Sequence, residues 1–381
     1  MTSKERVIKT INHEEPDRVP VGEWGIDHDH ISRILGRHTY WRNRKDTTIA
    51  LWEGRRDEVV ESLKRDCAEF IEKLDYDIIT VEMVPPKGYV HPDPPKQVAD
   101  GVWEDSRGNV YKYAASNDSI VCVTHSEGKE ELTDEDIEKA MKKVSTPIDE
   151  SQFELVDYIC ERYGDEKAIL FRGIDIYGCL MGIFGGDESH QLILPLIAPD
   201  EIKKMYEYGL AANKRKIDHL AKKNVLIAMQ GKDFGMNTGT IMSPDTIRDI
   251  YMPFAKMVND EISKNGMYPF FHCCGKIWDI LDDMVAAGYK GYQSIQESAG
   301  MDTRKVKEKY GKDLTLWTGV QCETLVMGTM EDVEKEVTEN LKFLMPGGGF
   351  IFGSTNSVQY GAKTDNYLKA LEIVREKGVY R

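Results

Sequence analysis

His272 and the two cysteines that follow it, Cys273 and Cys274, are the densest group of metal-binding side chains in the sequence. They come directly after the apolar run 268–271, which predicts a strand that ends at them. In an extended backbone His272 and Cys274 point to one side and Cys273 to the other. Imidazole and thiolate are preferred zinc ligands, and a catalytic zinc site uses about three protein ligands with one open position. The group therefore indicates either a metal site or a hydrogen-bonded histidine beside two core cysteines.

Three further reactive side chains stand where apolar runs end. Cys322, shortly after the run 314–317, is a candidate third metal ligand or a buried thiol. Asp233 is a candidate proton-transfer group, metal ligand or support for a ligand, or else a hydrogen-bond acceptor within a loop. Glu82, directly after the run 77–81, is either a catalytic carboxylate or an ion-pair partner.

The elements that must position these side chains are seven short apolar runs. They are 77–81, 168–171, 225–229, 268–272, 291–295, 314–317 and 349–352. Continuous apolar runs are typical of strands buried on both faces, and strands that alternate with helices predict a parallel sheet. With an eighth strand near 19–21, the runs fit a single (β/α)8 TIM barrel over residues 1–381. Because functional side chains of such barrels lie at the C-terminal ends of the strands, Trp24 and Tyr177 are a candidate substrate-pocket wall or, alternatively, plain core.

Residues 84–150 interrupt this rhythm. A proline cluster leads into segments 102–105 and 110–113, which predict a hairpin, and 126–145 predicts a charged, exposed helix. We expect this stretch to be an insertion in one loop of the barrel. Elsewhere Ser3 is the predicted N-cap of the first helix, and two later stretches, 244–264 and 330–344, are long enough for crossover helices.

Charge and composition exclude several classes of function. The 381 residues include 65 acidic and 50 basic side chains, for a net charge of −15, which argues against nucleic-acid and anionic-membrane binding. No apolar run approaches the roughly 18 residues of a membrane span. No apolar segment follows Met1, so we expect no secretory signal. The seven cysteines are an odd number in a large chain, which predicts reduced thiols and a cytoplasmic location.

Several segments spread through nearly the whole chain resemble the uroporphyrinogen decarboxylase superfamily. They are Glu14-Glu15-Pro16-Asp17-Arg18-Val19-Pro20-Val21, Leu180-Met181-Gly182 after Gly173, Ser243-Pro244 at a helix start, Phe271-His272-Cys273-Cys274-Gly275, and Gly347-Gly348-Gly349-Phe350-Ile351. The resemblance implies a (β/α)8 barrel with its pocket at the C-terminal mouth. It also implies one of two chemistries: decarboxylation of a tetrapyrrole, or zinc- and corrinoid-dependent methyl transfer.

The methyltransferase branch is the better match. His272, Cys274 and Gly275 fit its H-x-C-G motif, whereas the third thiolate of that branch aligns with Asn356, so another group must complete the site or the metal is absent. A zinc with fewer thiolates is harder and favours an oxygen ligand. The segment 353–358 looks like members associated with O-demethylation. The resemblance thus implies transfer of a methyl group from a small methylated donor, a methyl ether, to Co(I) of a partner corrinoid protein, with Asn356 as a substrate contact.

Two alternatives stay open. A decarboxylase of the tetrapyrrole type would need an arginine-rich N-terminal loop, but residues 21–27 contain no arginine and two acids, Glu23 and Asp27. A pocket lined by those acids would repel a polycarboxylate substrate. The other alternative is a barrel that binds a corrinoid or tetrapyrrole without catalysis, which the missing third thiolate motivates.

Overall fold

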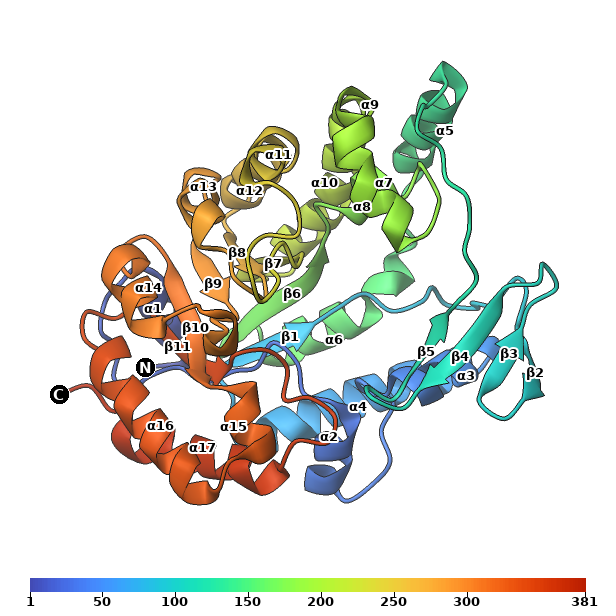
Figure 1. Cartoon of the computed structure of the whole chain (residues 1–381). Helices are drawn as coiled ribbons and strands as arrows, with labels where there is room; N and C mark the ends of the chain where they lie inside the picture. The colour runs from blue at the N-terminus through green and yellow to red at the C-terminus, as the bar shows by residue number, and fades with distance from the viewer.

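The computed structural model describes all residues, 1–381, and its centre is a curled sheet of seven parallel strands (Figure 1). Their order in the sheet follows their order in the chain. They are β1 (Ile78–Val81), β6 (Ala168–Ile174), β7 (Ile227–Gly231), β8 (Tyr268–His272), β9 (Gly291–Gln293), β10 (Thr315–Val320) and β11 (Phe350–Ser354). Each of the seven apolar runs is therefore a strand, as predicted.

Alternate residues along these strands face two separate apolar clusters. Ile78, Leu170 and Met229 share one cluster with Trp317 on the inside of the curled sheet. Their chain neighbours, such as Phe171, pack instead in the larger cluster between the sheet and the outer helices. Since both faces are buried, most positions of a strand are apolar, which explains the continuous runs.

Residues 20–22 occupy the place of the eighth strand. The Phe352 amide donates to the Pro20 carbonyl (2.9 Å), and the Gly22 amide donates to the Phe352 carbonyl (3.1 Å). On the other side the Asp77 amide donates to the Val21 carbonyl (2.8 Å). These bonds join β11 to β1 and close the (β/α)8 barrel. The segment is too short and irregular to form a regular strand, and Pro20 within it has no backbone N–H to donate.

A buried carboxylate, Asp77, fastens this closing segment. It accepts hydrogen bonds from Arg6 (2.7 Å), from Arg18 (2.6 Å) and from the Val21 amide (2.8 Å). Arg6 lies on the first helix. Val7 of that helix packs into the inner cluster, and the helix covers one end of the barrel. The N-terminal residues are thus part of the barrel itself.

Helices cover the outer face of the sheet. They are α1 (Ser3–Ile11), α2 (His28–Leu35), α3 (Arg44–Trp52), α4 (Arg56–Leu74), α5 (Asp134–Ser145), α6 (Glu154–Tyr163), α7 (Gly178–Met181), α8 (Glu188–Ile197), α9 (Pro199–Lys204), α10 (Tyr206–Lys222), α11 (Pro244–Ile250), α12 (Met252–Lys264), α13 (Leu281–Ala286), α14 (Thr303–Tyr310), α15 (Cys322–Met327), α16 (Met330–Leu344) and α17 (Thr364–Lys377). Short 3-10 turns occur at Glu150–Phe153, Trp278–Ile280 and Glu297–Ala299. None of the helices has both the length and the apolar character that a bilayer crossing requires.

Two local predictions need correction. Thr2, not Ser3, caps α1, because Thr2 and Glu5 form a reciprocal capping box that Ser3 cannot make from inside the helix. The stretch 244–264 is two helices, α11 and α12, which meet at Tyr251, because Pro253 lies in the first turn of α12. The helix predicted over 330–344 is α16, with the same bounds.

Residues 84–150 build a separate small layer beside α3 (Figure 1). Four antiparallel strands form it: β2 (Lys96–Ala99), β3 (Val102–Glu104), β4 (Val110–Ala114) and β5 (Ser119–Cys122). The predicted hairpin is β3–β4, and the predicted charged helix is the shorter α5. The stretch enters after β1 and returns to the barrel through α6.

Candidate functional site

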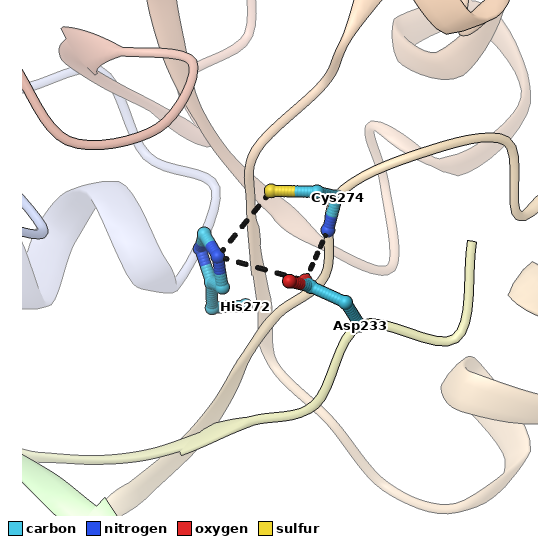
Figure 2. Close-up of side chains that lie close together, drawn as sticks. All are labelled: Asp233, His272 and Cys274. Carbon is cyan, nitrogen blue, oxygen red and sulfur yellow. Dashed lines mark hydrogen bonds and ion pairs between the residues drawn. The ribbon is translucent and has the colours of Figure 1, made fainter. Parts of the chain in front are cut away.

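Asp233, His272 and Cys274 meet at the C-terminal ends of two neighbouring strands, β7 and β8 (Figure 2). His272 Nε2 lies 3.5 Å from Cys274 Sγ and 3.8 Å from Asp233 Oδ1. One ligand atom from each residue lies within 4.8 Å of the other two. The Cys274 amide donates to Asp233 Oδ1 (2.8 Å), which fixes the loop after β7 against the loop after β8. We call these three residues the triad.

Alternation along the backbone explains which cysteine joins the triad. His272 and Cys274 lie on one side, as the sequence predicted, and Cys273 turns into the core. There its sulfur accepts a hydrogen bond from the Phe234 amide (3.2 Å). Cys273 therefore holds the β7 loop in place, and Cys274 alone offers its thiol to the mouth of the barrel.

Gln293, at the end of β9, sets the orientation of the His272 ring. Its side-chain Nε2 donates to the Ser354 carbonyl (3.0 Å), so its Oε1 must be the group that accepts from His272 Nδ1. The ring therefore carries its proton on Nδ1, and the Nε2 lone pair faces Asp233 and Cys274. Burial, the largest cause, lowers the pKa of His272 below its ordinary value, which favours the neutral ring. Neutral imidazole with one oriented lone pair is the form that binds metal.

The Cys274 thiol lies among donors from two other strand ends. The Asn356 amide nitrogen donates to Cys274 Sγ (3.0 Å), and the Ser294 hydroxyl donates to it (3.3 Å). Ser294 adopts a φ of 85°, a costly conformation for a residue with a side chain. Burial raises the pKa of Cys274 to about 12, so the thiolate needs a further positive charge to form.

Trp24 covers the His272 ring. The two rings stack with centroids 4.6 Å apart and planes at 5°. The Arg172 guanidinium contacts the same indole, 5.1 Å from its centroid, and pairs with Glu82. Trp24 thus joins the triad to the Glu82–Arg172 ion pair, and Glu82 is positioned beside the site rather than within the triad.

Two predicted site residues stand apart from the triad. Cys322, at the start of α15, has the Thr355 hydroxyl and the Ser357 carbonyl as its partners, each 3.6 Å from the sulfur. Tyr177, before α7, stacks with Tyr251, and Lys232 Nζ lies 3.4 Å from its ring centroid. Its buried hydroxyl has no hydrogen-bond partner. The structure therefore places both at the barrel mouth without a contact to the triad.

The charge predicted for the N-terminal side of the pocket is wrong. Glu23 is buried and turns to the Ser354 amide (3.0 Å), and burial raises its pKa to about 8. Asp27 is buried and accepts two hydrogen bonds from Arg42 (2.8 and 3.1 Å). Glu23 therefore keeps its proton near neutral pH and Asp27 is paired, so neither places an uncompensated negative charge at the opening. The segment 21–27 has no arginine of its own, and the arginines near it belong to other parts of the chain. The local sequence therefore does not reveal them.

The triad fits a zinc ion by its donor atoms. Imidazole nitrogen, thiol sulfur and carboxylate oxygen are all zinc ligands, and three protein ligands with one open position are typical of catalytic sites. The Nε2 lone pair has no proton on it to displace. The Asp233 side chain is 56% exposed, so the fourth coordination position would face the barrel mouth. The oxygen ligand, Asp233, follows β7, whereas Asn356, the position at which the related motif would have a further thiolate, follows β11.

Sequence comparison adds family information for the C-terminal part of the chain. Residues 191–377, just under half of the chain, match the family model described as Uroporphyrinogen decarboxylase (URO-D). No curated protein matches the sequence. The matched segment contains all three residues of the triad.

Structural comparison bears on the whole fold. A methyltransferase from Methanosarcina mazei superimposes with a TM-score of 0.65 at 17% identity, over 99% of this chain and 98% of that one. A xylose isomerase-like TIM barrel protein from Mycobacterium smegmatis reaches a TM-score of 0.39 at 12% identity, over 94% and 97%. The chain is thus a TIM-type barrel with the fold of the M. mazei protein, and its residues 191–377 match the uroporphyrinogen decarboxylase family model.

Proposed function

We propose that the protein is a methyltransferase that moves a methyl group from a small methyl ether to the Co(I) of a corrinoid carried by a partner protein. One observation carries the proposal: Asp233, His272 and Cys274 offer three different ligand atoms at the mouth of the barrel. The likeness to a methyltransferase barrel supports it. In this proposal the protein works in the cytoplasm, where its seven free thiols stay reduced.

The reaction determines what the site must do. The ether C–O bond breaks, a C–Co bond forms, and Co(I) is formally oxidised to Co(III). The leaving oxygen takes a proton and departs as an alcohol or phenol. An ether oxygen is a poor leaving group, so its developing negative charge must be stabilised during the displacement.

The triad would hold zinc, which supplies a positive charge that stabilises the leaving oxygen. Gln293 keeps the His272 ring in the ligand form. Asn356 and Ser294 donate to Cys274 Sγ and so stabilise its thiolate. Cys322, predicted as a ligand, is then left outside the ligand set.

The remaining candidates would bind and orient the donor. We assign Trp24 to the pocket wall beside His272, because its indole is flat and apolar and already fixed by stacking. Tyr177 would contribute its ring, since its hydroxyl is buried without a partner, and Asn356 would contribute its carboxamide beside Cys274. The docked corrinoid protein would cover the mouth and exclude water from the reaction.

The test is methyl transfer to reduced cobalamin. The purified protein, supplied with zinc, is mixed with cob(I)alamin and 4-methoxybenzoate, and methylcobalamin is followed by its absorbance. We expect product with the parent and none with His272→Ala. His38→Ala is the matched control, since His38 lies on the surface and pairs with Asp46. Full activity of the His272 variant would refute the assignment.

Decarboxylation is the second candidate, and one observation favours it: Arg42, Arg44 and Arg172 surround a cavity beside the site. Arginines bind carboxylates, which a tetrapyrrole carries in number. Parallel incubations decide between the two: release of carbon dioxide from a porphyrinogen without cobalamin would favour decarboxylation, and methylcobalamin formation from 4-methoxybenzoate with cob(I)alamin would favour methyl transfer.

A further inference from the structure

A cavity of about 290 Å³ opens where β1 and β6 end, between α3 and α4. Its charged lining consists of three arginines, Arg42, Arg44 and Arg172, and one acid, Glu82. Apolar side chains, including Leu51 and Leu63, form much of the remaining wall. We call it the arginine cavity. It combines a cationic side with an apolar side.

Arg42 is placed in this cavity at a cost. Its φ of 61° lies in the left-handed region, which costs a residue with a side chain roughly 1 kcal/mol. Its side chain is only 9% exposed, with Nε and Nη2 bonded to Asp27 and Nη2 also to Ser357. Nη1 has no hydrogen-bond partner. A residue that holds a costly backbone conformation and lines a cavity with an unpaired guanidinium nitrogen is typical of a ligand site.

The other two arginines also keep free donors. Arg172 uses Nη2 for Glu82 and has no partner for Nε or Nη1. Arg44 Nη1 donates to the Asn117 carbonyl (3.3 Å), and its Nη2 lies 3.6 Å from Asp27. A guanidinium has five N–H donors in a planar fork, which matches the two oxygens of a carboxylate.

The charges around the cavity leave one positive charge uncompensated. Three guanidinium groups face two carboxylates, Asp27 and Glu82, so the net charge is +1. A carboxylate carries one negative charge and neutralises this surplus. A phosphate monoester carries nearly two and would leave the cavity negative.

The arginine cavity lies next to the triad. A smaller cavity of about 30 Å³ shares Arg42, Glu82 and Arg172 with it and is also lined by Trp24. Trp24 stacks on His272, as described above. A ligand whose anionic end lies among the arginines therefore has its other end directed along Trp24 towards the metal site.

We propose that the arginine cavity binds a carboxylate of the methyl donor, so that the donor is a small carboxylic acid with a methyl ether. Only the identification of the ligand as the methyl donor rests on the proposed function; the carboxylate-binding site does not. Arg42 is the fixed member, held by Asp27, and Arg44 and Arg172 are the members that close on the ligand. Glu82 positions Arg172.

Binding of a carboxylate without a methyl group isolates this claim. Benzoate is titrated calorimetrically into the parent, Arg44→Gln and Arg172→Gln, with Arg33→Gln as the matched control. Arg33 is an exposed arginine on α2 that pairs with Asp365 and does not line the cavity. We expect about tenfold weaker binding in each cavity variant, the factor for one lost charge-assisted hydrogen bond, and no change in the control.

Neutral and dianionic probes test the chemical class. Benzamide should bind at least about tenfold more weakly than benzoate, since it lacks the charge. Phenyl phosphate should also bind more weakly. Benzoate binding should fall as salt rises. Equal benzoate affinity in the parent and both cavity variants, or no benzoate binding at all, would overturn the proposal. Tighter binding of phenyl phosphate than of benzoate would mean that the cavity binds a phosphate rather than a carboxylate.

The two proposals fail separately. If benzoate binds through Arg44 and Arg172 but 4-methoxybenzoate yields no methylcobalamin, the cavity stands and the methyl-transfer function fails. If 4-methoxybenzoate and neutral methoxybenzene are demethylated equally well by the parent and by Arg44→Gln, the function stands and the carboxylate site fails.

Discussion

Replacement of Gln293 by leucine should weaken zinc binding by 10- to 100-fold. Gln293 is fully buried and is the acceptor for His272 Nδ1. Leucine has a similar size and cannot accept, so the Nδ1 proton would be buried without a partner, at a cost of about 1–3 kcal/mol. The free protein can avoid that cost by moving the proton to Nε2, where Asp233 Oδ1 lies 3.8 Å away. Metal binding must then return the proton from Nε2 to Nδ1.

The free energy of that reversal sets the size of the effect. A cost of about 1–3 kcal/mol corresponds to roughly 5- to 150-fold in affinity, in line with the loss of 10–100-fold typical for partners of metal-bound histidines. The assay is competition for zinc against a chromophoric chelator, with circular dichroism as the check on folding.

Gln293→Glu is the discriminating variant. A carboxylate still accepts from Nδ1, so zinc affinity should stay within a few-fold of the parent value. It loses the hydrogen bond to the Ser354 carbonyl, so its thermal stability should fall as it does for leucine. A folded Gln293→Leu protein with parental zinc affinity would refute the reasoning about the ring proton.

Three further changes have defined outcomes. Asp233→Asn keeps the acceptor for the Cys274 amide but loses the anionic ligand, so the melting temperature should hold while zinc affinity falls at least about tenfold in the chelator assay. Burial raises the pKa of Glu23 to about 8, whereas the unfolded group ionises near 4.5. The folded state alone keeps its proton between those values, so the free energy of unfolding should fall by about 1.4 kcal/mol per pH unit as pH rises through that window. Urea titrations across the window should show a flatter pH dependence for Glu23→Gln, and equal slopes would contradict the assignment. Trp317→Phe removes the donor to the Gly22 carbonyl (3.1 Å) and should cost about 1–3 kcal/mol in urea unfolding, with no loss if that bond contributes nothing.

The strands could be predicted because their environment is uniform. Ile78 and Ile79 point to opposite faces of β1, yet both are buried in apolar clusters, so the run is continuous and easy to find. The segment 20–22 gave a weaker signal, since Pro20 lacks a backbone donor and the segment pairs with residues far along the chain. Its place became clear only from the structure.

The candidate site was predictable where neighbours in sequence are also neighbours in space. His272 and Cys274 lie two residues apart on one extended segment, and alternation alone puts them together. Asp233 joined them because adjacent parallel strands end at the same edge. Gln293 was missed, although an amide within an apolar run is a recognisable sign of a buried hydrogen bond.

The arginines were missed for a different reason. Arg42 precedes α3 and Arg44 begins it, in a charged stretch that resembles any solvated surface segment. Only the folded chain brings them beside Arg172 on β6. The partners of Asp27 likewise could not be read from residues 21–27, so the sign of the local charge was predicted incorrectly.

The closing segment also constrains how the chain is made. Residues 20–22 leave the ribosome long before Phe352, their partner on one side. Until then one edge of the nascent sheet is open and available for wrong pairing. Long-range closure of this kind slows folding. Two segments far apart in the sequence thus form one seam of the barrel. Loss of either segment should therefore loosen that same seam.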